Sequence, residues 1–170
     1  VQIGGISRDI IAGISRHGGR AIGVSGHDCG GFLQARPRRH FDRETGAPVD
    51  LGRVGDITAV HGGALRHLLD AGLIPVVSPV AVDADQRSLN VNADSVATAV
   101  AAALGASRLG FLTDVDGIHG PDGAPAPTVT GAQLRAWIAQ GIISGGMIPK
   151  AETALAAIEG VHSAVSAVTV

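Results

Sequence analysis

Short apolar segments typical of buried strands alternate along this chain with segments whose apolar residues recur at helical spacing. The segments typical of strands are Ala21–Ser25, Phe32–Arg36, Ile74–Val80, Arg108–Thr113 and the terminal residues 163–170. Helical spacing is found in residues 6–14, 63–72, 93–104, 131–141 and 147–160. Strands that are joined through helices usually run parallel. The order therefore predicts an α/β fold with a mostly parallel sheet flanked by helices.

The composition limits the classes of protein that this chain can belong to. Its 170 residues, 45% of them hydrophobic, are enough for a single folded domain over residues 1–170. A formal net charge of −2 offers no basic field for nucleic acid. No apolar run approaches the roughly 20 residues that span a bilayer, so no membrane partner is expected. The single cysteine, Cys29, and the lack of a secretory signal pattern favour a cytoplasmic location.

Ligands of open α/β sheets bind at the carboxyl ends of the strands, so the strand-to-helix junctions are the informative places. The first junction is NVNAD, where Asn90, Asn92 and Asp94 precede an apolar helix. One such residue can be a helix cap, which is the simpler interpretation of Asn92 or Asp94. Three polar residues exceed the needs of a cap. Asn90 and Asn92 face the same way in an extended segment, which suits a bound carboxylate.

Two further junctions lie in the second half of the chain. In LTDVDGIHG, Leu112–Gly120, the Asp116-Gly117 pair is typical of a simple turn, and the backbone of such a turn can also hold a nucleotide. In ISGGMIPK, Ile143–Lys150, two glycines permit close backbone approach before a helix that begins near Pro149. This is not a P-loop, and Lys150 can equally be a surface residue.

Together the three junctions favour phosphoryl transfer, a reaction that needs positioning and charge neutralisation. Lys150 would offset negative charge on the transferred phosphoryl group, and Asp94 would organise the site. A carboxylate acceptor with a pKa near ~4 is already ionised at neutral pH and needs no general base. No metal site is predicted, because the seven histidines include no pair at ligand spacing with an acidic partner.

The same motifs resemble the amino acid kinase family, and within it the N-acetylglutamate kinases. The resemblance is carried by NVNADSVATAVAAALGASRLGFLTDVDGI and ISGGMIPKAETALAAIEG, and also by RHGGRAIGVSGHD, VDLGRVGDI and LLDAGLIPVVSPVA. It implies the carbamate kinase-like fold and phosphorylation of the side-chain carboxylate of N-acetyl-L-glutamate by ATP with Mg²⁺, an early step of arginine synthesis. It also implies a homo-oligomer, either a dimer or a hexamer.

The resemblance assigns roles by position. Lys150 and Asp94 become catalytic residues, and Asn90 and Asn92 bind the substrate. The residues implied to line the nucleotide are Asp114, Val115, Asp116, Gly117, Ile118, His119, Ile142, Ile143, Ser144, Gly145, Gly146 and Met147. Asn92 favours acetylglutamate, because kinases for aminoadipate derivatives tend to carry aspartate there.

The chain also departs from the family pattern. Family members are longer and begin with a strand that carries a second catalytic lysine and a Gly-Gly turn, followed by another glycine-rich loop. None of these is recognisable here, so the chain is interpreted as a partial domain, mainly its nucleotide-binding side. Ser7 stands where the family usually has asparagine. Two other functions stay open: a non-catalytic nucleotide-binding or assembly module, and a kinase for a related substrate such as an aminoadipate derivative.

Overall fold

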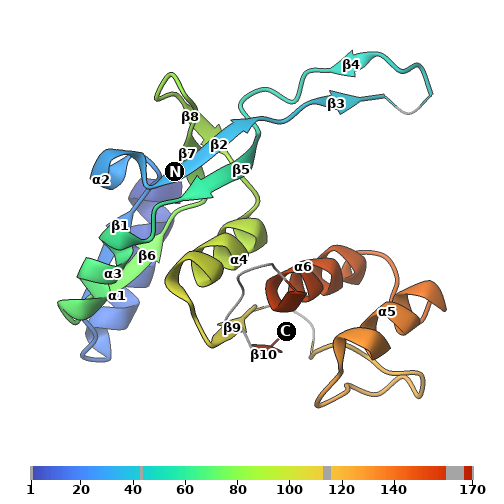
Figure 1. The fold of residues 1–170 in the computed structure, drawn as a ribbon. Helices are drawn as coiled ribbons and strands as arrows, with labels where there is room; N and C mark the ends of the chain where they lie inside the picture. The colour runs from blue at the N-terminus through green and yellow to red at the C-terminus, as the bar shows by residue number, and fades with distance from the viewer. Residues whose placement is uncertain (1, 43, 113–115, 160–166, 170) are drawn as a thin grey trace. The chain divides into compact units, whose positions relative to one another are not determined.

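The computed structural model describes residues 2–42, 44–112, 116–159 and 167–169 (Figure 1). The chain divides into two compact units, residues 1–96 and 97–170. The boundary falls inside α4 (Ala93–Leu104), a helix whose predicted bounds are confirmed. No helix within the described ranges is both long and apolar enough to cross a membrane.

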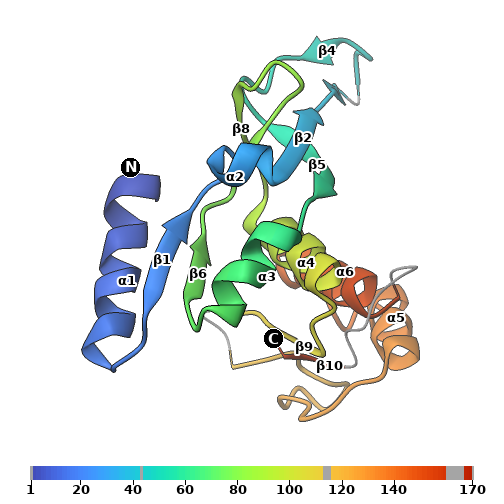
Figure 2. The same cartoon turned by 60° about the vertical axis from the view of Figure 1, so that its left-hand side comes forward.

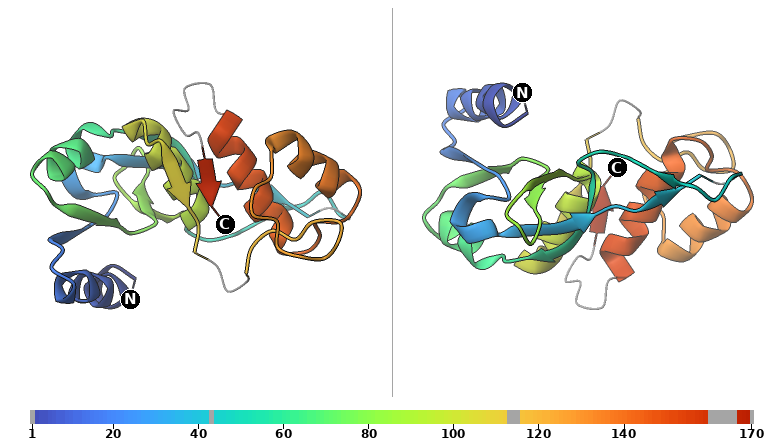
Figure 3. Two further views of the ribbon diagram at one scale, coloured as in Figure 1. Left: turned by 90° about the horizontal axis from the view of Figure 1, so that it is seen from below. Right: turned by 90° about the horizontal axis from the view of Figure 1, so that it is seen from above.

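In the first unit, two helices cover a pair of parallel strands. The strands β1 (Ala21–Val24) and β6 (Ile74–Val77) pair from Ala21↔Ile74 to Val24↔Val77. A short π-helix, η1 (Gln2–Ile6), leads into α1 (Ser7–Arg16), which lies on the opposite side of the strands from α3 (Gly63–Asp70) (Figures 2 and 3). Helix α1 ends where Gly18 adopts a φ of 81°, a conformation that glycine accepts without strain.

The same unit contains a four-stranded sheet in the order β5-β2-β7-β8. Its strands are β2 (Leu33–Pro37), β5 (Gly55–Val60), β7 (Val80–Val82) and β8 (Ser88–Asn90). The β2–β5 and β7–β8 pairs are antiparallel, and β2 pairs with β7 in parallel at Gln34↔Val82. Leu33, Val82 and Leu89 are almost fully buried and form its core. Beyond it, β3 (His40–Phe41) and β4 (Pro48–Val49) form an exposed hairpin (Figure 1).

Local differences from the sequence-based expectations appear in this unit, and they include the unpredicted short strands β3, β4 and β8. The predicted strand Ile74–Val80 is two strands, because Pro79 has no N–H to donate and the chain changes partners there, from β1 to β2 and β8. The expected loop after β1 contains a single turn, α2 (Asp28–Gly31), in which Cys29 and Gly30 have left-handed φ angles of 53° and 78°, so it is not a regular helix. Strand β5 was not predicted, because its sequence GDITAV carries a weak apolar pattern.

In the second unit, α5 (Gly131–Ala139) packs against α6 (Met147–Glu159) around a core formed by Leu134, Ile143, Ala151 and Leu155. Thr130 caps α5 as predicted, and the Thr130 and Gln133 side chains form a capping box. Strand β9 (Arg108–Gly110) pairs in parallel with β10 (Ala167–Thr169), the described part of the expected terminal strand. The α/β class and the parallel pairs confirm the predicted fold class, and the antiparallel sheet is an addition to it.

Candidate functional site

The polar residues of the NVNAD stretch lie on the exposed side of a buried segment in the first unit. Leu89 and Val91 are 1% and 4% exposed, whereas Asn90 and Asn92 are exposed. This alternation is the one expected for an extended segment. The main-chain N–H of Asn90 donates to the Arg53 carbonyl at 2.7 Å, which ties the end of β8 to the neighbouring segment.

Asn92 caps helix α4. Its Oδ1 accepts hydrogen bonds from the Ser95 main-chain N–H at 2.9 Å and from the Ser95 hydroxyl at 3.1 Å. The simpler interpretation of Asn92 as a cap is therefore confirmed for its side-chain oxygen. The Nδ2 group of the same amide keeps the ability to donate to a ligand. Asp94 is half-buried in the first turn of α4, where the helix dipole stabilises a carboxylate.

A cavity of about 540 Å³ lies in the second unit, between the turn that starts at Asp116 and the segment leading into α6. That volume falls within the roughly 300–1,000 Å³ typical of small-molecule sites. The residues that line it are Asp116, Gly117, His119, Ile142, Ile143, Ser144 and Met147, all of them among the twelve that the sequence assigned to a nucleotide. Their proposed ligand stays a prediction, but the structure does bring these seven residues together.

The other five residues of that set fall elsewhere. Ile118 packs against the core formed by Leu134, Ile143, Ala151 and Leu155 and does not line the cavity. Gly145 and Gly146 are exposed just before α6 and do not line the cavity. Asp114 and Val115 lie outside the described residues.

The floor of the cavity is held by the ends of α5 and α6. The main-chain N–H groups of Ile142 and Ile143 both donate to the Trp137 carbonyl, at 3.0 and 3.2 Å, and so close the end of α5. This turn points Ile143 into the core, where it is 4% exposed. The Met147 N–H then donates to the Ser144 carbonyl at 3.3 Å, where α6 begins. The apolar wall of the cavity is thus continuous with the core of the unit.

The polar wall of the cavity carries an ion pair. His119 Nε2 lies 2.7 Å from Asp116 Oδ1, and the two side chains are 47% and 69% exposed. The hydrogen bond that His119 donates to the Asp116 carboxylate raises the pKa of His119, and Gly123 and Asp122 raise it to a smaller extent. The bond from His119 in turn lowers the pKa of Asp116. Gly117, between the two, has a φ of 131° that only glycine adopts readily.

The sign of both pKa shifts gives the pH range of this pair. Because the pKa of His119 is raised, the stability that its charge adds to the folded chain is complete below about pH 6.5. This stability is lost as the pH rises through the raised pKa. Because the pKa of Asp116 is lowered, the stability that its ionised carboxylate adds is complete above about pH 4. This stability is lost as the pH falls through the lowered pKa. The stabilisation that the pair contributes is therefore complete from about pH 4 to 6.5 and declines on either side.

Lys150 is half-buried in the first turn of α6, one residue after Pro149. Proline at that position is compatible with the helix, because the first N–H groups of a helix have no partner within it. Lys150 belongs to the same unit as the cavity, while Asn90, Asn92 and Asp94 belong to the NVNAD stretch of the other unit.

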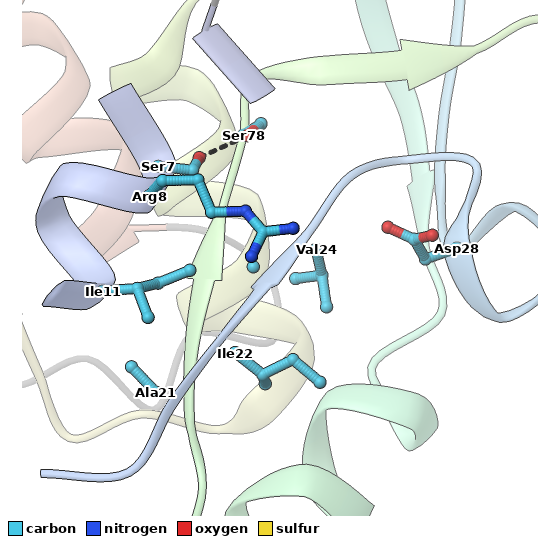
Figure 4. A pocket seen from close by; sticks show the side chains of 9 residues that line it. Ser7, Arg8, Ile11, Ala21, Ile22, Val24, Asp28 and Ser78 are labelled. Carbon is cyan, nitrogen blue, oxygen red and sulfur yellow. Dashed lines mark hydrogen bonds between the residues drawn. The ribbon is translucent and has the colours of Figure 1, made fainter. Parts of the chain in front are cut away.

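A second cavity, of about 270 Å³, lies between α1 and β1 in the first unit (Figure 4). The buried hydroxyls of Ser7 and Ser78 form a 3.1 Å hydrogen bond at its edge. Arg8 reaches across it toward Val24, with Asp28 farther along the same opening (Figure 4). Among these residues, Ser7 is the one that the sequence analysis singled out as a departure from the family's usual asparagine.

The parallel strand pairs and the flanking helices define an α/β protein, and a cavity of ligand size lies beside the start of one of its helices. Residues 1–165 match the amino acid kinase family, and the chain belongs to that family.

Individual relatives fall in the same family. The chain is 42% identical over 163 residues to an acetylglutamate kinase of Symbiobacterium thermophilum, covering 94% of this chain and 55% of the relative. It is 48% identical over 160 residues to an acetylglutamate kinase of Chloroflexus aurantiacus, covering 94% of this chain and 60% of the relative. The chain therefore spans somewhat more than half the length of the curated relatives that it matches.

Solved structures share the fold. The smu.665 protein of Streptococcus mutans UA159 superposes with a TM-score of 0.77 and 25% identity, over 99% of this chain and 67% of the other. The N-acetylglutamate synthase of Neisseria gonorrhoeae, solved with coenzyme A and N-acetyl-glutamate, gives a TM-score of 0.73 and 25% identity. That match covers 97% of this chain and 38% of the synthase.

Proposed function

We propose that this chain is the nucleotide-binding part of an acetylglutamate kinase and that it binds ATP in the cavity of the second unit. The observation that carries the proposal is that cavity, because its seven lining residues all come from the two segments assigned to a nucleotide by sequence. The identity of 42% and 48% to acetylglutamate kinases supports the choice of reaction.

The reaction needs no proton transfer to the acceptor. A side-chain carboxylate oxygen of N-acetyl-L-glutamate attacks the γ-phosphorus of ATP, the bond from that phosphorus to the β–γ bridging oxygen breaks, and ADP leaves as the anion. The products are N-acetyl-L-glutamyl 5-phosphate and ADP. The carboxylate is already ionised at neutral pH, so the protein positions the reactants and neutralises charge.

Each group of residues has a defined part in this proposal. Ile142, Ile143 and Met147 form an apolar wall against which the base packs. The phosphates lie toward the start of α6, where helix N–H groups and Lys150 stabilise negative charge. Asn90 and the Nδ2 group of Asn92 donate to the substrate, and Asp94 organises the site. Mg²⁺ would arrive with ATP and be held mainly by phosphate oxygens.

The biological setting follows from the same proposal. An acetylglutamate kinase acts in arginine biosynthesis, and we expect it in the cytoplasm as a homo-oligomer, dimeric or hexameric. Analytical ultracentrifugation of the chain tests the assembly, and a purely monomeric species at every concentration would contradict it.

The test of the function combines binding and turnover in the full 170-residue chain. Isothermal titration with ATP measures binding, and hydroxylamine trapping of the acyl phosphate measures transfer to N-acetyl-L-glutamate. We expect ATP binding, and transfer that is faster with N-acetyl-L-glutamate than with N-acetyl-L-aminoadipate. ATP binding without hydroxamate would identify a nucleotide-binding module instead of a kinase. Absence of ATP binding would overturn the proposal altogether.

Asn92 allows stability and substrate binding to be separated. Asn92→Asp keeps an oxygen acceptor for the Ser95 N–H, so we expect the free energy of unfolding to stay within about 0.5 kcal/mol of wild type. The new charge faces the substrate carboxylate, so the KM for N-acetyl-L-glutamate should rise roughly tenfold or more. Asn92→Ala is the matched control, since it removes the cap and should cost about 1 kcal/mol. An unchanged KM in Asn92→Asp would exclude substrate contact at this residue.

A further inference from the structure

A third cavity lies in the first unit, and the proposed function makes no use of it. Its volume of about 480 Å³ falls within the range typical of small-molecule sites. It is lined by residues of β2, of β5 and of the turn that joins β7 to β8 (Figure 1). The polar residues of this lining are Gln34, Arg36, Thr58, Asp83, Asp85 and Gln86.

The sheet side of the cavity is built by strand alternation and by a shift in register. Ala35 is buried between Gln34 and Arg36, so the side chains of these two residues lie on the opposite face of β2. The register of β2 with β5 shifts after Gln34 and skips Thr58. A bulge of this kind turns a side chain out of the regular alternation, and Thr58 joins the cavity lining.

Arg36 brings a positive charge to this side of the cavity. Its cross-strand neighbour is Asp56, but that carboxylate is engaged by Arg38, whose Nε and Nη2 both lie 2.7 Å from Oδ1. None of the ion pairs among the described residues includes Arg36. A guanidinium presents two parallel donors to a carboxylate, so Arg36 suits a ligand that carries one.

The two carboxylates of the β7–β8 turn have different surroundings. The Asp83 side chain is 12% exposed, and its Oδ1 accepts from the N–H groups of Asp85 and Arg87 at 3.0 and 2.8 Å. Its Oδ2 lies 3.4 Å from Arg53, so Asp83 holds the turn and its charge is compensated. The Asp85 side chain is 73% exposed, and its 3.8 Å contact with Arg87 is a surface pair that contributes little. Asp85 can therefore receive a cationic group of a ligand.

Gln86 supplies an amide to the same turn at a conformational cost. Its φ of 59° lies in the left-handed region that glycine adopts most readily. The amide group lies near Gly31, since a Cβ added to that glycine would be 3.6 and 3.7 Å from Oε1 and Nε2 of Gln86. The amides of Gln34 and Gln86 can each donate and accept hydrogen bonds, which is what a peptide bond requires of its partners.

We propose that this cavity binds a zwitterion of dipeptide length, with its carboxylate on Arg36 and its ammonium group on Asp85. The two charges belong to different elements, β2 and the turn, so the ligand carries its charges at separate ends. A peptide bond between those ends satisfies the two glutamine amides. A polyanion would be repelled by the turn carboxylates, and a simple cation would be repelled by Arg36. The proposal is independent of the nucleotide site.

Isothermal titration of the full chain with L-alanyl-L-alanine tests this site at about pH 7, where both ends of the dipeptide are charged. We expect a Kd of about 1 mM or below. L-Alanyl-L-alaninamide lacks the carboxylate and N-acetyl-L-alanyl-L-alanine lacks the ammonium group, so each should bind roughly tenfold or more weakly. L-Alanine should also bind weakly, because its two charges sit on one carbon and cannot reach both side chains.

Two variants assign the two ends of the ligand. Arg36→Gln should bring the dipeptide and its amide to equal affinity, while the preference over the acetylated dipeptide remains. Asp85→Asn should have the reverse effect. Arg39→Gln and Asp50→Asn are the matched controls, because these residues are exposed outside the cavity and the charge changes are the same. The amide oxygen at position 50 can still accept from the Gly52 N–H, and both controls should bind as wild type.

Gln86→Gly separates binding from folding. Glycine accepts the left-handed conformation without strain, so the urea midpoint should equal or exceed that of wild type. Affinity for the dipeptide should nevertheless fall severalfold, because one amide partner of the peptide bond is lost. A variant that keeps wild-type affinity would remove Gln86 from the site.

The remaining outcomes decide the proposal directly. No binding of L-alanyl-L-alanine up to about 10 mM would overturn it. Equal affinity for the dipeptide and its two blocked forms would also overturn it, because recognition of charge at both ends would be absent. L-Alanine that binds as tightly as the dipeptide would contradict the separation of the charges. An unchanged preference for the free carboxylate in Arg36→Gln, or for the free ammonium group in Asp85→Asn, would place the ligand elsewhere.

Discussion

Lys150→Ala is expected to reduce hydroxamate formation from ATP and N-acetyl-L-glutamate by about 100-fold or more. The reason is electrostatic: an amine that stabilises the transferred phosphoryl group acts mainly in the transition state, so the loss should fall on kcat more than on KM. Lys150 is half-buried in the first turn of α6, so circular dichroism of the variant is needed to separate a loss of folding from a loss of catalysis.

Two control variants accompany Lys150→Ala: one removes a different cation, and the other keeps a positive charge at position 150. Arg135→Ala also removes a cation from this unit, but its partner is Glu159, away from the cavity residues, so turnover should be unchanged. Lys150→Arg keeps the charge but replaces a compact ammonium by a planar group, and only partial activity is expected. Wild-type turnover in Lys150→Ala would remove this residue from the mechanism.

Lys150 also offers a direct test of its location, because it is the only lysine in the chain. An amine-selective acylating reagent therefore modifies one side chain besides the α-amino group. Saturating ATP should slow acylation of Lys150 if the phosphates lie beside it. Mass spectrometry of the peptide that contains residue 150 measures the rate. Equal rates with and without ATP would contradict phosphate contact at this lysine.

The helices were predictable because their signals are local. The α4 sequence carries a capping asparagine, no charge after Asp94 and a continuous apolar run, and its bounds agree with the prediction. Thr130 and Gln133, three residues apart in sequence, likewise predict the start of α5 as a capping box. The antiparallel sheet was not predictable in this way. Its register depends on pairs such as Leu33↔Val60, and GDITAV alone says little about that partner.

The candidate site divides in the same manner. The motifs located the cavity residues, since the turn at Asp116 and the segment from Ile142 to Met147 supply its two sides. It did not reveal that His119 contacts Asp116, because an i, i+3 pair in a loop meets only if the intervening glycine folds it back. At Asn92 the sequence allowed two interpretations, a helix cap and a substrate contact. Its capping bond and its proposed substrate contact use different atoms of one amide, so neither interpretation excludes the other.

Gly26→Ala is expected to lower the free energy of unfolding by about 3 kcal/mol or more. Gly26 is buried just after β1, and its N–H donates to the Val80 carbonyl at 2.7 Å. An added Cβ would lie 2.4 Å from the Val80 oxygen, 2.7 Å from the Ala81 Cα and 3.0 Å from the Leu33 oxygen. All three are backbone atoms of the β2–β7 region, so no rotamer change can relieve the overlap.

Gly13→Ala is the matched control for that substitution. Gly13 lies inside α1, and the closest atom to an added Cβ is Arg16 Nη2 at 3.9 Å, an ordinary contact. Alanine there should stabilise the chain by about 0.5–1 kcal/mol through helix propensity alone. Urea unfolding followed by circular dichroism measures both variants against wild type. If Gly26→Ala unfolds at the same urea concentration as wild type, β1 does not cross β7 as closely as the structure requires. The close backbone contact between the residue that follows β1 and strand β7 of the four-stranded sheet would then be contradicted.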